Sequence, residues 1–167
     1  MLYYITGGER SGKSKYAQNL ALQLSSSPYY LATSRIWDDN HRERVDRHIA
    51  ERDHRWISIE EEKELAKPII EHSVVVIDCV TLWLTNFFTD TNNDVSTSLA
   101  QAKTEFDKLL SINATIIIIS NEIGMGVHAS TEIGRKFTEL QGWMNQHIAK
   151  KADKAILMVS GIPVTIK

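Results

Sequence analysis

Short apolar runs recur along the chain, and longer amphipathic or charged segments separate them. Most of these runs lack strict alternation of apolar and polar residues, which is typical of strands covered on both faces. The pattern predicts strands over Leu2–Thr6, Tyr29–Thr33, Val74–Asp78, Thr115–Ser120 and Lys154–Ser160. It predicts helices over Lys13–Leu24, His41–Asp53, Glu60–His72, Leu82–Phe88, Ser96–Leu110 and Glu132–Lys151. Because strands and helices alternate, we expect an α/β fold with a mostly parallel central sheet flanked by helices.

Two further runs, Trp56–Ile59 and Val164–Lys167, show a weaker strand pattern, and we expect each to add an edge strand. The chain has 167 residues, of which 43% are apolar, and it contains no internal repeat or low-complexity tract. This length and composition suit one globular core. We therefore expect residues 1–167 to form a single domain.

Composition argues against several classes of protein. The formal net charge is −2, so the chain lacks the basic field with which proteins bind nucleic acid. A single cysteine, Cys79, excludes an internal disulfide framework and is expected to be a small buried residue. The apolar runs are far shorter than the ~20 residues of a membrane-spanning helix, and the start MLYYITGG lacks the features of a secretory signal. We expect a cytoplasmic protein with no membrane span and no nucleic-acid partner.

The segment GGERSGKS lies between the first predicted strand and the first predicted helix. It fits the phosphate-binding pattern GxxxxGK followed by Ser or Thr, in the strand and helix context that this motif needs. In such a loop, backbone N–H groups surround phosphate oxygens, the lysine reaches the outer phosphates and the hydroxyl binds Mg²⁺. A chance glycine-rich turn is the alternative. We expect a P-loop (RecA-like) domain whose nucleotide site includes Gly7, Gly8, Glu9, Arg10, Ser11, Gly12, Lys13 and Ser14, with Lys13 in a catalytic role.

A carboxylate that completes the metal site is expected at the end of another strand. Four apolar residues precede Asp78, which would lie at the carboxyl edge of the sheet, where open α/β sheets bind ligands. An acidic residue at a strand end is, by itself, more often a cap or turn residue. Together with the phosphate loop, the pattern predicts that Ser14 and Asp78 bind Mg²⁺.

The segment from Ala32 to Trp56 is rich in charge and holds three of the six histidines and six arginines. If it is helical, His48 shares one face with His41 and Arg52. Neighbouring guanidinium groups disfavour the imidazolium form, which would keep His48 neutral and nucleophilic near pH 7. A solvated charged helix with an incidental histidine is the alternative. These residues alone leave both interpretations open.

Six segments of this chain occur together in a known family: ITGGERSGKS, YLATSRIWDD, the R-V-x-x-H pattern at Arg44 to His48, VVVIDCVTLWLTN, SNEIGMGV and VSGIPVTIK. On these segments the chain resembles, nearly end to end, the bifunctional adenosylcobinamide kinase/adenosylcobinamide-phosphate guanylyltransferases of cobalamin biosynthesis. A phosphate loop is shared by many families, whereas this combination in one short chain is specific.

The resemblance implies two reactions. Adenosylcobinamide would first be phosphorylated on its aminopropanol hydroxyl with ATP or GTP. GMP would then move from GTP to that phosphate through a guanylylated histidine, to give adenosylcobinamide-GDP. The resemblance also implies Mg²⁺ as cofactor and a homotrimer, and the apolar run Leu82–Phe88 would then supply an exposed oligomer contact.

Site residues follow from the same resemblance. His48 matches the histidine that is guanylylated, and Glu122 would line the corrinoid or nucleotide cleft. Further nucleotide contacts are implied at Ala32, Thr33, Ser34, Arg52, Glu60 and Asp78. Met125, Trp83 and Trp143 could touch a large apolar corrinoid, but such side chains usually belong to a core, and we expect this of Trp143.

Two other functions remain open at this point. The chain could be a kinase-only member in which His48 is merely structural. It could also be a RecA-like nucleotide-dependent switch or ATPase, for which the phosphate loop and Asp78 would suffice, although the absence of a basic stripe argues against that class.

Overall fold

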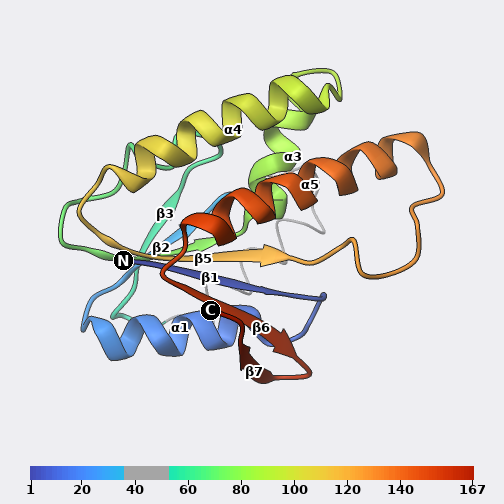
Figure 1. Ribbon diagram of the computed structural model, residues 1–167. Coiled ribbons are helices and arrows are strands. Elements are labelled where there is room, and N and C mark those ends of the chain that lie inside the picture. The colour runs from blue at the N-terminus through green and yellow to red at the C-terminus, as the bar shows by residue number, and fades with distance from the viewer. Residues whose placement is uncertain (36–52) are drawn as a thin grey trace.

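The computed structural model describes residues 1–35 and 53–167, which build a seven-stranded sheet with helices on both faces (Figure 1). The strands are β1 (Leu2–Gly7), β2 (Tyr29–Ala32), β3 (Ile57–Glu60), β4 (Val74–Asp78), β5 (Thr115–Asn121), β6 (Lys154–Val159) and β7 (Ile162–Thr165). The helices are α1 (Lys13–Leu24), α3 (Val80–Asp90), α4 (Val95–Leu110) and α5 (Glu132–Lys151). The α/β class that the pattern predicts is confirmed.

The strands are arranged in the order β3-β2-β4-β5-β1-β6-β7. The pairs from β3 to β6 are parallel, and β7 runs antiparallel to β6 as the second strand of a hairpin. β5 therefore lies between β1 and β4, and Gly7 at the end of β1 is level with Asn121 at the end of β5. Parallel strands end at the same edge of a sheet, so the loops that follow β1, β2, β3, β4 and β5 meet there.

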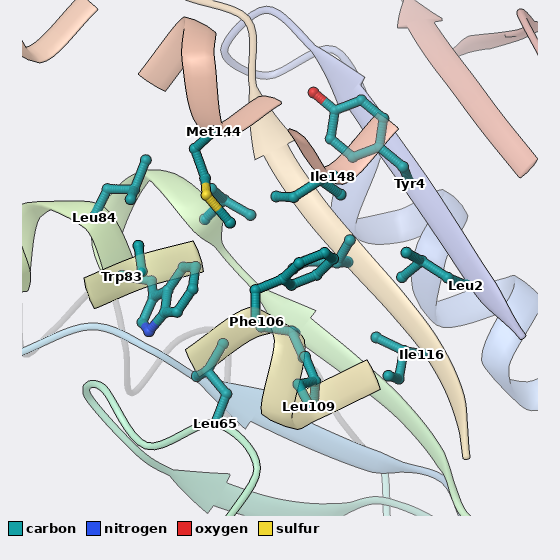
Figure 2. Close-up of a cluster of buried hydrophobic side chains, with 14 of the residues drawn as sticks. Leu2, Tyr4, Leu65, Trp83, Leu84, Phe106, Leu109, Ile116, Met144 and Ile148 are labelled. Atoms are coloured by element: carbon teal, nitrogen blue, oxygen red, sulfur yellow. The ribbon is translucent and has the colours of Figure 1, made fainter. Parts of the chain in front are cut away.

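Alternate residues of the strands face two separate hydrophobic cores. Leu2 and Tyr4 of β1 contact the larger core, built with α3, α4 and α5, whereas Ile5 contacts the smaller core beneath α1. Figure 1 shows this division, with α1 on one face and α3, α4 and α5 on the other. Figure 2 shows the larger core, in which the side chains of Trp83, Phe106 and Met144 pack over the sheet. All three are fully buried.

The five strands predicted with the stronger pattern are confirmed within one residue at each end, and the predicted helix over Lys13–Leu24 has the predicted bounds. The edge strand predicted at Trp56–Ile59 is β3, shifted by one residue, and the one at Val164–Lys167 is β7, which begins and ends two residues earlier. The helix predicted over His41–Asp53 lies outside the described residues, except for Asp53 at its end.

The helix predicted over Glu60–His72 is wrong, because residues 61–73 form bends and turns. Pro68 lacks a backbone N–H and cannot take part in an internal helical ladder. The backbone of this segment bonds to side chains instead: Glu61 accepts from the N–H groups of Lys63 and Glu64 at 3.0 Å, and Glu105 accepts from Ala66 N at 3.1 Å. The carbonyl of Lys63 accepts the Trp83 indole N–H at 3.0 Å. These bonds outweigh the helical pattern of the sequence.

Helix α3 corrects a second expectation. Its apolar residues were expected to form an exposed oligomer contact, but Trp83, Leu84, Phe87 and Phe88 are buried in the larger core. The apolar residues of the helix are buried because they pack in the core that α3 forms with the sheet, α4 and α5. The reverse holds for Trp143, which was expected in the core and is 43% exposed on α5.

Candidate active site

The phosphate loop joins β1 directly to α1, as the motif requires. Gly12 is the N-cap of α1 and has φ 94°, and a Cβ there would lie 3.2 Å from Gly161 Cα. Gly7 has φ 151°, and a Cβ there would lie 2.5 Å from the carbonyl oxygen of Met158. Both positions therefore need glycine, since the backbone of β6 and of the β6–β7 turn lies against the loop. Gly161 N also donates to Ser11 O at 2.9 Å.

Lys13 is the first residue of α1, and it is 7% exposed. Its ammonium group donates to the Gly8 carbonyl at 2.6 Å, so the side chain turns back over the loop. Burial lowers the pKa of Lys13, although Cys79, Asp78 and Glu9 act in the opposite direction. Desolvation costs the charged form unless an anion compensates it. An ammonium held in this position is suited to contact phosphate oxygens.

Asp78, the last residue of β4, lies next to the phosphate loop. Its Oδ2 atom accepts hydrogen bonds from the Ser14 hydroxyl at 2.8 Å and from the Tyr30 hydroxyl at 2.6 Å. The predicted pair of Ser14 and Asp78 is therefore brought together, although β5 lies between β4 and β1, the strand that precedes the loop to Ser14. Tyr30 is a third member that the sequence analysis missed. A tyrosine in a buried strand needs a partner for its hydroxyl, which is the signal that could have found it.

Thr33 fixes the backbone at the end of β4. Its side chain is fully buried, and its hydroxyl donates to Cys79 O at 2.8 Å and accepts from Cys79 N at 2.9 Å. Thr33 N also donates to the Asp78 carbonyl at 3.1 Å. The thiol of Cys79 is buried as expected, and burial raises its pKa to about 12, which disfavours the reactive thiolate form. Thr33 thus holds the peptide that carries Asp78.

Three predicted nucleotide contacts lie in one row at the carboxyl edge of the sheet. Ala32 at the end of β2 is level with Glu60 on β3 and with Asp78 on β4. Ser34 follows in the same loop, and Arg35 after it bonds to Glu62 at 2.7 Å and to both carboxylate oxygens of Asp90. Lys63 also pairs with Asp90. These ion pairs hold Arg35, the last described residue before the segment that contains His48, at this edge of the sheet.

The other members of the predicted loop are exposed, with Gly8, Glu9 and Arg10 at its tip. Glu122 follows β5 at the same edge, and its N–H donates to the carbonyl of Gly7 at 3.0 Å. The predicted His48 and Arg52 lie outside the described residues. Their roles remain predictions.

The family model for cobinamide kinase / cobinamide phosphate guanyltransferase matches residues 3–166. The chain belongs to this family. Among curated relatives, the bifunctional adenosylcobalamin biosynthesis protein CobU of Escherichia coli is 34% identical over the full length of both chains. CobP of Pseudomonas aeruginosa, with the same bifunctional description, is 32% identical over 98% of this chain and 95% of its own. CobU of Salmonella typhimurium is 31% identical, again over both full lengths.

The chain is also similar to solved structures, but in fold alone. The ATPase from the type III secretion system of pathogenic bacteria shares a TM-score of 0.52 and 11% identity, over 98% of this chain and 56% of that chain. The chain thus shares its α/β fold with that ATPase. Its membership of the family makes it an enzyme of adenosylcobalamin biosynthesis with both named activities. The alternative of a nucleotide-dependent switch is therefore not needed.

The site residues fit a bound nucleotide and Mg²⁺. In the phosphate loop, the buried Ser11 Oγ has no hydrogen-bond partner among the described residues. A phosphate oxygen would supply that partner and would also compensate the buried charge of Lys13. Ser14 and Asp78 offer a hydroxyl and a carboxylate oxygen, which are the hard oxygen ligands that Mg²⁺ prefers. Of the helices in residues 1–35 and 53–167, none is both long and apolar enough to cross a membrane.

Proposed function

We propose that this enzyme phosphorylates adenosylcobinamide with ATP or GTP and then transfers GMP to the product through His48. The observation that supports this most strongly is the convergence of Lys13, Ser14 and Asp78 at one edge of the sheet, with Ser14 and Asp78 2.8 Å apart. That arrangement suits transfer of a phosphoryl group, because it gathers positive charge and metal ligands around phosphates.

In the kinase step, the aminopropanol hydroxyl oxygen attacks the γ-phosphorus of the nucleotide. The bond from that phosphorus to its bridging oxygen breaks, the nucleoside diphosphate leaves, and the hydroxyl proton passes to solvent. Lys13 and the N–H groups of the phosphate loop hold the phosphates and counter their charge during the transfer. Mg²⁺ held by Ser14 and Asp78 would neutralise charge on the outer phosphates.

In the second step, an imidazole nitrogen of His48 attacks the α-phosphorus of GTP, and pyrophosphate leaves. The phosphoramidate that forms is then attacked by a phosphate oxygen of adenosylcobinamide phosphate, which restores His48 and gives adenosylcobinamide-GDP. Support comes from the position of His48 in the chain, 13 residues after Arg35. Bonds to Glu62 and Asp90 hold Arg35 at the edge of the sheet where Asp78 lies. Ala32, Ser34, Arg52 and Glu60 are proposed nucleotide contacts.

The test of both steps is incubation of the enzyme with adenosylcobinamide, GTP and Mg²⁺, followed by mass spectrometry of the corrinoid. The proposal predicts adenosylcobinamide phosphate early and adenosylcobinamide-GDP later, with release of one pyrophosphate for each GMP transferred. A corrinoid that stops at the phosphate would show a kinase-only enzyme. Omission of Mg²⁺, with excess chelator, is the control and should abolish both products.

We also propose that the enzyme assembles as a homotrimer, as the family resemblance implies. Because α3 is buried, the contact would have to use other surfaces, and the exposed apolar residues of the β6–β7 hairpin are candidates: Val159, Ile162 and Val164. Light scattering of the purified protein is the test. The proposal predicts three times the monomer mass of 19.0 kDa, and a monomer at micromolar concentration would contradict it.

A further inference from the structure

The loop that joins β5 to α5, residues 122–131, projects from the sheet beside the phosphate loop (Figure 1). Its first residue, Glu122, donates its N–H to the Gly7 carbonyl at 3.0 Å, so the two loops are in direct contact. A pocket of about 480 Å³ lies between this loop and the first two turns of α5. The loop that lines this pocket begins at Glu122, directly after β5, at the carboxyl edge of the sheet.

Apolar side chains of this loop are exposed to an unusual degree. Val127 is 96% exposed and Met125 is 79% exposed, and Ile133 in the first turn of α5 is 55% exposed. Val127 lines the pocket together with Ile123 and Ala129. Neighbouring apolar residues that remain in water indicate a surface for an apolar ligand.

Hydrogen bonds within the loop and to α5 hold it in this shape. Gly124 N donates to Glu122 Oε1 at 2.8 Å, and Arg135 donates to the carbonyls of Ala129 and Ser130 at 3.2 and 3.1 Å. A Cβ at Gly134 would lie 2.9 Å from Ala129 Cβ, so the glycine lets the loop pack against the helix. The exposed side chains are thus presented by an anchored loop, which reduces the entropy cost of binding.

We propose that the loop of residues 123–129, with the first two turns of α5, binds the corrin ring of the cobinamide acceptor. This inference rests on the proposed function, in which the acceptor hydroxyl must reach the phosphates held by Lys13. A corrin ring is too large to enter the phosphate loop, so it must lie on an adjoining surface. The ring is apolar with amide groups on its rim, and the pocket combines apolar residues with charged ones at its border: Glu132, Arg135, Lys136 and Glu139.

The other candidate contacts for the corrinoid are less suitable. Trp83 is fully buried in the larger core. Trp143 lies 11 residues beyond the start of α5, about 16 Å along the helix, and lines a different hollow between α4 and α5. Of the three residues that the sequence analysis considered, Met125 alone is exposed and lies in the loop that begins at Glu122, whose N–H donates to Gly7 O.

The test is a double variant, Met125→Ser with Val127→Ser, which removes two exposed apolar side chains and should leave folding intact. Its matched control is Ile70→Ser with Ile166→Ser, at two exposed apolar residues outside this loop. Equilibrium dialysis with adenosylcobinamide, which absorbs visible light, measures binding, and labelling by GTP in the absence of the corrinoid measures the first half of guanylyl transfer. We expect the loop variant to bind adenosylcobinamide at least about tenfold more weakly, while its labelling by GTP stays within about twofold of wild type.

Two results would overturn the inference: adenosylcobinamide affinity within about twofold of wild type in the loop variant, or an equal loss in the control variant. Either result leaves the proposed function intact if GTP still labels the enzyme. Failure of the proposed function is seen separately, as an absence of label in the wild-type enzyme, and does not alter the binding measurement.

Discussion

The Ser14 hydroxyl donates a hydrogen bond of 2.8 Å to Oδ2 of Asp78, a residue 64 positions away in the sequence. The two residues follow β1 and end β4, and β5 lies between these strands. The bond therefore exists only when β5 has been inserted and the parallel register of β1, β5 and β4 is set. The sheet must therefore be assembled before Ser14 and Asp78 can form the proposed metal site.

Replacement of Asp78 by Asn tests the metal site. The amide keeps the size of the side chain but removes the charge that would bind Mg²⁺, so we expect the kinase rate to fall by at least about 100-fold. The measurement is the kinase rate over a range of Mg²⁺ concentrations. Glu71→Gln, at an exposed residue in the turn before β4, is the control and should behave as wild type. A kinase rate for Asp78→Asn within about threefold of wild type would contradict the assignment.

Tyr30 should act as a positioning residue, because its hydroxyl holds Asp78 Oδ2 at 2.6 Å. Tyr30→Phe removes that bond and leaves the ring, which packs edge-on against Trp56. We expect the Mg²⁺ concentration for half-maximal rate to rise about three- to tenfold, while kcat at saturating Mg²⁺ changes little. Tyr29→Phe is the control on the same strand. A fall in kcat with an unchanged Mg²⁺ requirement would contradict a positioning role.

Thr33→Val should destabilise the fold. The substitution leaves the buried N–H and carbonyl of Cys79 without the hydroxyl that bonds to both, at a cost of about 1–3 kcal/mol in the free energy of unfolding. Urea denaturation followed by circular dichroism measures this. Thr104→Val, at an exposed position of α4 where the hydroxyl bonds only to Ala100 O, should change the free energy by less than about 0.5 kcal/mol. Equal effects of the two substitutions would count against the role given to Thr33.

Asp90 predicts a pH dependence of stability. Hydrogen bonds from Arg35 and Lys63 hold the pKa of the Asp90 carboxyl well below its usual range. A carboxyl whose pKa is lower in the folded state stabilises the protein above its unfolded pKa of about 4, and this contribution is lost as pH falls below that value. Asp90→Asn should therefore lower the Tm at pH 6 and lower it less at pH 3. Thermal melts at both values, with and without 0.5 M NaCl, measure this, and a Tm difference that grows at pH 3 would refute it.

The periodicity of the sequence was sufficient for the sheet and for α1 and α5, whose bounds agree with the prediction. Apolar runs of β-branched residues such as Ile116–Ile119 are typical of strands in a sheet that is covered on both faces. The error at Glu60–His72 arose because Glu105 and Trp83, from distant parts of the chain, bond to the backbone of that segment. Sequence pattern carries no information on such partners. The burial of α3 was missed for a related reason, since periodicity cannot tell a core helix from an interface helix.

For the candidate site, the motif predicted the phosphate loop and the partner strand, and the structure brings Ser14 and Asp78 together as expected. What the motif could not predict is the support around it, namely Tyr30 on Asp78 and Gly161 against Gly12. These contacts depend on the strand order, in which β2 lies beside β4 and β6 beside β1. The phosphate-loop motif describes one segment of the chain and therefore cannot predict the order of the strands in the sheet.

Labelling with GTP that carries the label on its α-phosphate tests the central claim most directly. The account predicts a wild-type enzyme that retains the label through denaturation, with the label on a peptide that contains His48. It predicts no label on His48→Ala, whose affinity for GTP stays within about threefold of wild type, and full label on the control His54→Ala. Label retained by His48→Ala, or mapped in the wild-type enzyme to any other residue, would contradict it.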